Sequence, residues 1–362
     1  VTSLPFVFAT TLAHQPLAPM ITSGTIILIL FAVFVVFIIA KGLRIVQQSE
    51  AMVIERLGKY QKTLTAGINV IIPIVDKPRE IISRLTRDLP DGNKYVQFIK
   101  KERLDLRETV FDQCNLAGAL FGGAQLRRAV FNQCQMEHVD FRSANLHAAV
   151  LSECLAMHGQ FAQAALTMAT LAKSRFDHAS WREVNLEASV ITQSSLIDVC
   201  ADGAAWLHTS VLECDVAHLT WQQSTMQRTV FHNTVLAGKS FVGLTLDGCM
   251  FASSDLTAAD FSSVPMRQCN FQSAKLDNAR FDGVSAPNSI FCQASGVGVS
   301  FAQADLRQAL FTGAQLDGCQ FQGANLHQAH FAGAQLARSN FASCDLTYAD
   351  FRHATLTGAE MR

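Results

Sequence analysis

Ten cysteines are the residues best suited to chemistry in this chain of 362 residues. Thiolates at suitable spacings bind metal ions or form disulfides. Eight of the ten stand two residues before a position that is apolar at every fifth residue, and Cys114, Cys134 and Cys154 are twenty residues apart. A one-sided column of thiols lacks the convergent ligands of a metal site. We therefore expect small, buried, unpaired thiols, in a reducing compartment or an inert core.

Histidines and carboxylates are the other candidates for chemistry. His327 and His330 are three residues apart, which on a helix would make a ligand pair. In a five-residue pattern they fall on exposed positions of one side, so we expect no metal role for them. The carboxylates are scattered, and the chain has no P-loop, nucleophile elbow or HExxH motif. The sequence predicts no catalytic, cofactor-binding or metal-binding residues, and hence a protein that is not an enzyme.

A five-residue repeat positions these residues. From Leu106 to Met361 every fifth residue, which we call the central residue, is Phe, Leu, Met, Trp, Ile or Val, with four exceptions. The exceptions are Ala156, Ala201, Ala286 and Gly296. Two positions before each central residue lies a small residue in most repeats, and Lys239 is the clearest departure. This period fits neither a helix nor a strand, and it indicates a repeat architecture.

The pattern resembles the pentapeptide repeat family, whose unit reads Ala, then Asp or Asn, then Leu or Phe, then two variable residues. The resemblance covers residues 106–362. It implies an all-β fold, a right-handed quadrilateral β-helix with four pentapeptides per coil and about 13 coils. At the roughly 4.8 Å spacing of neighbouring strands, the rod would be on the order of 60 Å long.

The interior of such a rod would be filled by the central residues, and stability would come from stacking of coils on their neighbours. The core ladder predicted in the regular stretches is Phe111, Leu116, Phe121, Leu126, Phe131, Phe301, Leu306, Phe311, Leu316, Phe321, Leu326, Phe331, Leu336, Phe341, Leu346 and Phe351. The small residues predicted to point inward are Cys114, Cys134, Cys154, Ala304, Ala309, Ala324 and Ala329.

Two zones depart from the regular filling. Residues 151–226 have mixed central residues and hold all three tryptophans, Trp181, Trp206 and Trp221. These could form a binding patch, but their central positions favour a wider local core. Around Ala286 and Gly296 the central residues are too small to fill the interior, so we expect cavities and a soft or bent rod there.

The N-terminal part of the chain does not follow the five-residue pattern. Residues 21–40 carry no charge and are rich in Ile, Val and Phe, which predicts a single transmembrane helix over 21–42. Residues 1–20 are unassigned. Positive charges follow the span and none precedes it, so the positive-inside rule places the rod in the cytoplasm and the protein in a bacterial inner membrane.

Residues 43–84 resemble the start of stomatin and prohibitin (SPFH, or band 7) proteins and would form a short α/β fragment. The matching residues are Ile54, Glu55, Arg56, Gly58, Lys59, Tyr60, Gly67 and Pro73. Ala66 stands where that family usually has Pro, and the resemblance stops near Arg84, short of the parts that make subunit contacts in that family. Residues 85–105 would form a linker and an N-terminal cap for the rod.

Three functions compete on these observations. The favoured one is a non-enzymatic, membrane-anchored scaffold whose rod binds a protein partner, without cofactor and without direct nucleic-acid binding. The second is a DNA-mimicking protein that binds gyrase, because residues 104–362 carry 23 acidic against 16 basic residues. That charge is much sparser than the one charge per roughly 1.7 Å of duplex DNA. The third is an effector or accessory protein of a secretion system.

Overall fold

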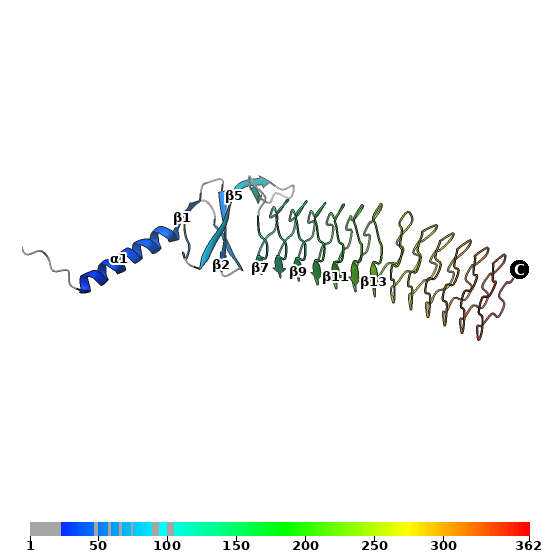
Figure 1. Cartoon of the computed structure of the whole chain (residues 1–362). Coiled ribbons are helices and arrows are strands. Elements are labelled where there is room, and N and C mark those ends of the chain that lie inside the picture. Colours follow the sequence, from blue (N-terminus) through cyan, green and yellow to red (C-terminus); the bar gives the residue numbers. More distant parts are fainter. Residues whose placement is uncertain are drawn as a thin grey trace, which may run out of the picture.

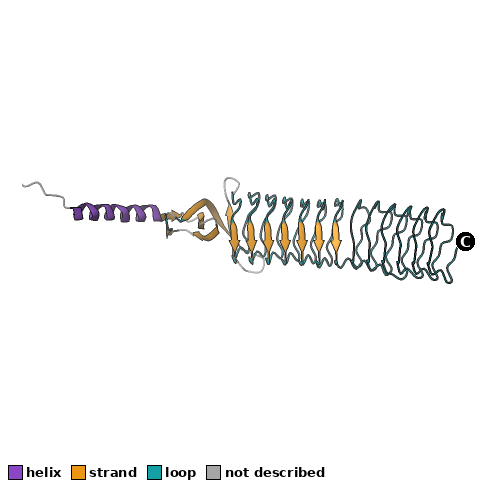
Figure 2. Cartoon of the chain, turned by 60° about the horizontal axis from the view of Figure 1, so that its bottom comes forward, coloured by secondary structure: helices purple, strands orange, loops and turns teal. Residues whose placement is uncertain are grey.

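The structure is a computed structural model, and it describes residues 23–46, 50–56, 59–64, 67–73, 75–88, 94–99 and 105–362. A helix leads into a small sheet, and a long stack of coils follows as a rod (Figure 1). Regular strands occur in the small sheet and on one face of the first coils, whereas the later coils consist of turns and loops (Figure 2).

The helix α1 (Ser23–Gly42) covers most of the transmembrane span predicted over residues 21–42, and the structure does not support that prediction. Within the described ranges, no helix is both long enough and apolar enough to cross a membrane. The physical reason lies at the helix ends, because Ser23, Gly24 and Thr25 begin it and Lys41 and Gly42 end it. The uninterrupted apolar run of residues 26–40 is about 22 Å long at 1.5 Å per residue. A hydrocarbon core is about 30 Å thick.

A small sheet follows α1. Its strands are β2 (Glu50–Arg56), β3 (Lys59–Leu64), β5 (Asp76–Asp88) and β6 (Lys94–Ile99), with β1 (Leu43–Val46) and β4 (Gly67–Val70) as a separate antiparallel pair. Met52 and Ile54 lie two apart on β2, so both point to one face, and they pack with Leu64 and Ile71. The predicted end of the SPFH-like segment at residue 84 falls inside β5, and β6 lies in the predicted linker.

An ion pair fixes the β2–β5 pairing. Arg56 and Asp76 are register partners, and Arg56 Nε donates to Asp76 Oδ1 at 2.6 Å. The buried Asp76 carboxylate also accepts the Ile72 N–H at 2.9 Å. The hydrogen bond from Arg56 lowers the pKa of Asp76. Arg56, which matches the SPFH pattern, thus has a structural role within this sheet.

The small sheet and the rod share one continuous ladder. β3 pairs with the first strand of the rod, β7 (Val110–Asp112), in parallel through Lys59 and Val110. The strand order is β13-β12-β11-β10-β9-β8-β7-β3-β2-β5-β6. A solenoid needs its terminal coil covered, because an open end leaves ladder groups unpaired. The N-terminal sheet contacts the first coil at this position.

The coils repeat every twenty residues. The parallel strands after β7 are β8 (Val130–Asn132), β9 (Val150–Ser152), β10 (Thr170–Ala172), β11 (Val190–Thr192), β12 (Ser210–Leu212) and β13 (Val230–His232). Each strand pairs with the residues twenty positions away, as Phe111 does with Phe131. Beyond β13 the same step continues as single bridges up to Asn340 and Glu360. Four pentapeptides therefore make one coil.

Tight turns set the five-residue period. The second residue after most central residues is left-handed, with a φ of 58° at Gln303. The third residue then donates its N–H to the central carbonyl, as Ala304 does to Phe301 at 3.2 Å. A non-glycine residue in this conformation costs on the order of 1–2 kcal/mol. Bonds between coils, such as Gln303 N to Gln322 O at 2.9 Å, offset that cost.

The central side chains fill the rod. The predicted ladder residues up to Phe341 are buried, and Leu346 and Phe351 in the last coils are partly buried. Rings twenty residues apart stack, with 5.0 Å between the centroids of Phe301 and Phe321. Rings ten residues apart meet edge to face, as Phe301 and Phe311 do at 5.7 Å. Both geometries are favourable for aromatic pairs, so one column supports the next.

The two irregular zones differ from each other. Trp181 and Trp206 are fully buried and Trp221 is 4% exposed, so the structure places all three in the core. At Gly296 the expected cavity is absent and the prediction is wrong. An added Cβ would lie 2.8 Å from Val299 Cγ2 and 2.9 Å from the backbone carbon of Leu276. The Val299 side chain and the neighbouring coil already occupy that space.

Candidate functional site

The ladder between coils opens at one place. On either side of it, coils are joined by N–H groups that donate to the carbonyl nineteen residues on, such as Trp206 N to Thr225 O and Phe241 N to Asp260 O, both at 2.8 Å. Between residues 217–226 and residues 236–245, which are all described, these backbone bonds are missing, whereas the preceding bridge between Asp215 and Val235 is still formed. We call these two facing segments the seam.

The seam involves only part of the coil. The N–H groups there that lack a ladder bond are those of His218, Trp221, Gln223, Met226, Ser240 and Thr245. On the next face the two coils stay joined, with Arg228 N to Asp247 O at 3.0 Å and Phe231 N to Met250 O at 2.7 Å. The coils therefore separate on one side, and the rod changes direction just after β13 (Figure 1).

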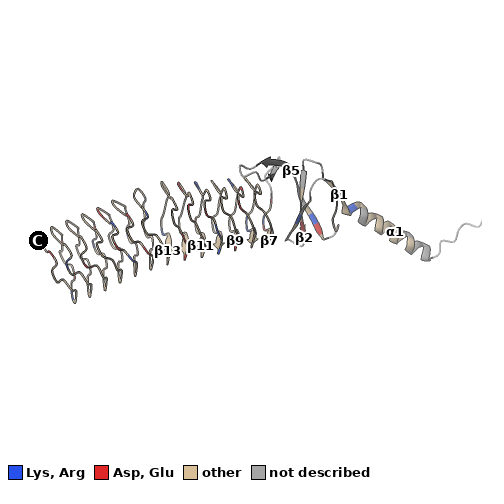
Figure 3. Ribbon diagram, turned by 180° about the vertical axis from the view of Figure 1, so that it is seen from behind, with Lys and Arg blue, Asp and Glu red and all other residues tan. Residues whose placement is uncertain are grey.

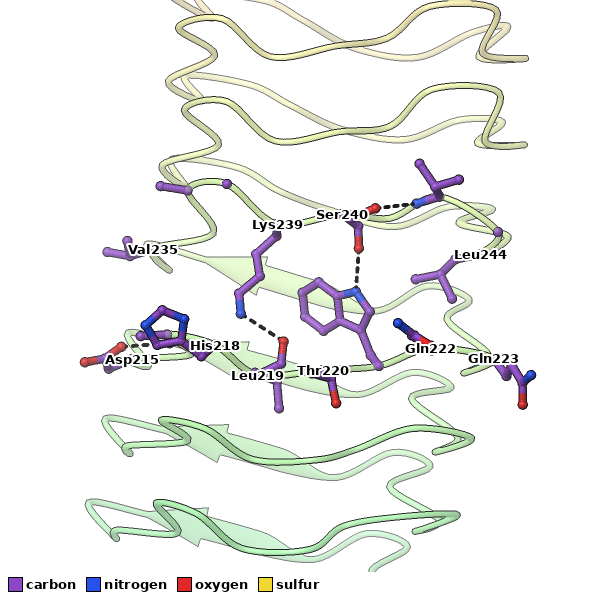
Figure 4. A pocket seen from close by; sticks show the side chains of 16 residues that line it. Asp215, His218, Leu219, Thr220, Gln222, Gln223, Val235, Lys239, Ser240 and Leu244 are labelled. Carbon is purple, nitrogen blue, oxygen red and sulfur yellow. Dashed lines mark hydrogen bonds between the residues drawn. The ribbon is translucent and has the colours of Figure 1, made fainter.

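Two side chains cross the seam in place of the backbone. Lys239 Nζ donates to Leu219 O at 2.9 Å, and Trp221 Nε1 donates to Ser240 O at 2.8 Å. Figure 4 shows the Lys239 side chain extended toward the Leu219 carbonyl. In the regular ladder, the Ser240 N–H would donate to Leu219 O and the Trp221 N–H to Ser240 O. Each side chain thus takes the acceptor of one lost ladder bond.

Lys239 explains the opening. It stands two positions before the central residue Phe241, where the regular coils have alanine or another small residue. An ammonium group cannot enter the apolar interior without a large desolvation cost. The side chain instead passes between the coils, with Nζ 5.7 Å from the centroid of the Trp221 ring. That ring remains in the core, 4.9 Å from Phe241.

The seam forms a cleft of about 820 Å³. Val235 and Val242 line it with side chains 58% and 54% exposed. Burial lowers the pKa of Lys239 to about 8, while the carboxylates of Asp198 and Asp215 act in the opposite direction. The cleft therefore combines exposed apolar side chains, a weakly basic amine and backbone groups without ladder partners. Such a set suits an extended polypeptide, because main-chain groups bind it and side-chain pockets select it.

The cysteines lie within the rod wall, away from any such cleft. All ten are free, and Cys134 and Cys154 are buried whereas Cys114 is partly buried. Cys134 Sγ donates to Phe111 O and Cys154 Sγ to Phe131 O, each at 3.4 Å. Burial raises the pKa of Cys114 to about 11. These thiols therefore act as small hydrogen-bonding side chains.

The alanines that were predicted to point inward lie in the rod wall, as the cysteines do. Ala304, Ala309, Ala324 and Ala329 are buried. Ser174 continues the cysteine column twenty residues after Cys154, and its hydroxyl donates to Leu151 O. No group of three or more His, Cys, Asp or Glu residues suited to a metal ion occurs in the described part of the chain.

His327 and His330 do not converge on a site. His330 Nδ1 lies 3.9 Å from Asp350 Oδ2, whereas the His327 ring meets the edge of Tyr348 at 5.7 Å. A different histidine set was missed by reasoning from the sequence.

His138, His158 and His178 form a stacked column on the rod surface, with centroids 5.0 Å and 5.1 Å apart. Their twenty-residue spacing in the sequence could have predicted this column. Desolvation and then the two neighbouring rings lower the pKa of His158.

Several surface carboxylates are paired with arginine. Bidentate or close pairs join Asp105 to Arg107, Asp140 to Arg142, Asp247 to Arg267, Asp305 to Arg307 and Asp350 to Arg352, with closest distances between 2.7 and 2.9 Å. Acidic and basic residues are interspersed along the rod (Figure 3). Pairing of this kind cancels the field of these carboxylates locally.

Residues 104–181 and 287–361 match the family model described as a pentapeptide repeat region. This match agrees with the five-residue pattern and with the bridges between the coils. The seam lies between the two matched ranges.

Several solved structures are similar. HetL from the cyanobacterium Nostoc sp. strain PCC 7120 is 18% identical and covers 71% of this chain and 91% of its own, with a TM-score of 0.25. QnrB1, a plasmid-mediated fluoroquinolone resistance protein, is 16% identical. Its match covers 57% of this chain and 90% of QnrB1, with a TM-score of 0.25. A pentapeptide repeat protein of the Arabidopsis thaliana thylakoid lumen is 27% identical over 26% of this chain and 67% of its own, with a TM-score of 0.26. The residue pattern and the bridges, rather than these overlays, establish the coil architecture.

One curated relative is "Uncharacterized protein Rv1488" of Mycobacterium tuberculosis, 33% identical over 57 residues. The match covers 16% of this chain, and the chain spans about 15% of the length of that relative. A protein of Mycobacterium bovis matches equally. These findings lend no support to the resemblance of residues 43–84 to SPFH proteins.

Proposed function

We propose that this chain is a non-enzymatic, protein-binding rod and that the seam is the place where an extended segment of a partner protein docks. One observation carries the proposal. Over residues 217–226 and 236–245 the backbone is without its ladder bonds, whereas the adjoining coils are joined by such bonds along most of their length. Unpaired strand edges recruit further strands, and native proteins normally protect them. An opening inside an otherwise regular ladder is therefore best understood as a place for a partner.

The side chains of the seam support the same function. Val235 and Val242 are exposed large apolar residues beside the unpaired backbone. In β-strand addition, main-chain hydrogen bonds supply affinity and pockets for alternate side chains supply specificity. The cleft offers both features, and the rigid coils on either side hold it open. The partner in this proposal is a protein segment in extended conformation.

The rod would work in a reducing compartment, with the bacterial cytoplasm as our proposal. Its ten cysteines are free, and several are buried in the coil wall with the thiol bonded to a carbonyl. Proteins in oxidising compartments commonly pair their cysteines.

Binding of a topoisomerase through a DNA-like surface is the second candidate. It draws on the acidic balance of residues 104–362. The arginine partners of Asp105, Asp140, Asp305 and Asp350 weaken it, because a DNA-like surface needs a continuous row of uncompensated negative charges.

Site-specific photo-crosslinking tests the docking proposal. A photoreactive phenylalanine analogue replaces Val242 in the seam or, as the matched control, Thr312, which follows a central residue in a regular coil. In bacterial cells making the full chain, we expect a crosslinked protein from position 242 and none from position 312. The crosslink is expected to weaken by about tenfold when Lys239→Ala restores the small residue of the repeat, which is about 1.4 kcal/mol of binding free energy.

Several outcomes of this experiment would reject the proposal. Equal crosslinking from both positions, or none from position 242, removes the seam as a docking site. A crosslink from position 242 that Lys239→Ala leaves unchanged also contradicts it. Identification of a topoisomerase subunit crosslinked only from position 312 would favour the second candidate, which a DNA supercoiling assay would then check.

A further inference from the structure

Lys239 has surroundings unlike those of an ordinary surface lysine. Its Nζ donates to a neutral carbonyl, that of Leu219, and the described residues place no carboxylate within ion-pair distance. Asp198 and Asp215 act on it only from farther away, and His218 lines the same cleft. The amine is about half buried beside the Trp221 ring, yet the cleft of about 820 Å³ gives access to it.

We propose that Lys239 is a site of acyl modification, at which the ε-amine accepts an acyl group from an acyl thioester. The neutral Nζ attacks the thioester carbonyl carbon, a C–N bond forms and the C–S bond breaks. The thiolate leaves and takes up the proton that Nζ sheds, so the products are an amide and a free thiol. The step is an acyl transfer without oxidation or reduction.

The environment makes this amine a nucleophile at neutral pH. Only the deprotonated amine attacks a carbonyl, and lysines become nucleophilic when desolvated in apolar surroundings. Burial lowers the pKa of Lys239 to about 8, with Asp198 and Asp215 limiting the shift. An ordinary lysine titrates near 10.4 and is almost wholly protonated at neutral pH. A much larger fraction of Lys239 is therefore reactive.

Acylation would leave the local hydrogen bond possible and remove the charge. An amide N–H at Nζ can still donate to Leu219 O, as the ammonium does now. The cation beside the Trp221 ring would be lost. The modification would thus turn a weakly basic seam into a neutral, more apolar one. It stands on the geometry of Lys239 and does not require the docking proposal to be correct.

Acetylation of the full chain by acetyl coenzyme A, used as the probe, tests the inference. The extent at Lys239 is followed by mass spectrometry between about pH 7 and about pH 10, and a synthetic peptide of residues 233–245 is the unfolded reference. At about pH 8 we expect acetylation of Lys239 in the folded chain to be at least tenfold faster than in the peptide. Its rate should level off above about pH 8–9, whereas the peptide rate should keep rising to about pH 10.

A rate at Lys239 in the folded chain that equals or falls below the peptide rate at about pH 8 overturns the inference. A pH profile that coincides with that of the peptide also overturns it. Failure of this experiment leaves the crosslinking result from position 242 unaffected, and the reverse also holds.

Discussion

Replacing Phe281 by alanine is expected to lower the free energy of unfolding by about 3–5 kcal/mol. Phe281 is fully buried and stacks on Phe261 at 4.8 Å and on Phe301 at 4.9 Å. It also meets the edges of Phe271 at 5.4 Å and Phe291 at 5.6 Å. The alanine variant removes all four ring contacts and leaves a cavity that rigid neighbouring coils cannot close.

Urea denaturation followed by circular dichroism measures this loss, and Phe351→Ala is the matched control. Phe351 is partly exposed, stacks on the ring of Phe331 at 4.8 Å and meets the edge of Phe341 at 5.7 Å, so it has two ring contacts against four for Phe281. We expect its replacement to cost about 1–2 kcal/mol, because less surface is buried there. Equal losses at the two positions would contradict the stacked interior as the main source of stability.

Replacing Gly296 by leucine is expected to destabilise the rod by about 3 kcal/mol, although it restores a residue type typical of the repeat. An added Cβ alone would approach Val299 Cγ2 to 2.8 Å and the backbone carbon of Leu276 to 2.9 Å. Leucine would force the backbone of the neighbouring coil to move. If the cavity expected from the sequence were present, the same substitution would instead stabilise the rod.

Thermal and urea unfolding of Gly296→Leu distinguish these results. Leu276→Met is the control, since a volume-conserving change in the same cluster typically costs less than about 1.5 kcal/mol. A Gly296→Leu variant more stable than the parent chain would show that the packing around Val299 is not as described.

The sequence was a good guide to the regular coils, because one rule governs them. A central residue at every fifth position must point inward once each pentapeptide forms one side of a coil, so buried Phe311 and Leu316 follow directly. The Gly296 error has a physical cause. The rule considers one position at a time, whereas Val299 Cγ2 comes from a neighbouring pentapeptide and takes the same space.

The seam was much harder to predict. Its five-residue register continues without an insertion, so the pattern gives no sign that the backbone separates over residues 217–226 and 236–245. Lys239 was the one visible signal, as a departure from the small residue. Its consequence depends on which carbonyl Nζ reaches and on the Trp221 indole that bonds to Ser240 O. Those contacts join residues about twenty positions apart and require the stacked coils.

The N-terminal part shows the limits of composition as a guide. The apolar run of α1 suggested a membrane span, yet the polar and glycine residues at its ends leave too short an apolar stretch. The pairing of Lys59 with Val110 could also not be predicted from the sequence, because only Val110 lies in the five-residue repeat.

Amide hydrogen exchange at the seam tests the central claim most directly. The amides of Ser240 and Thr245 have no ladder bond, whereas the matched amides of Gln320 and Asn325 donate to Val299 O at 2.9 Å and Ala304 O at 2.8 Å. We expect Ser240 and Thr245 to exchange at least about 100-fold faster than Gln320 and Asn325 in the full chain, because exchange protection follows local hydrogen bonding. Equal protection at the four amides would mean that the coils are closed at Lys239, and the seam could not be the docking site.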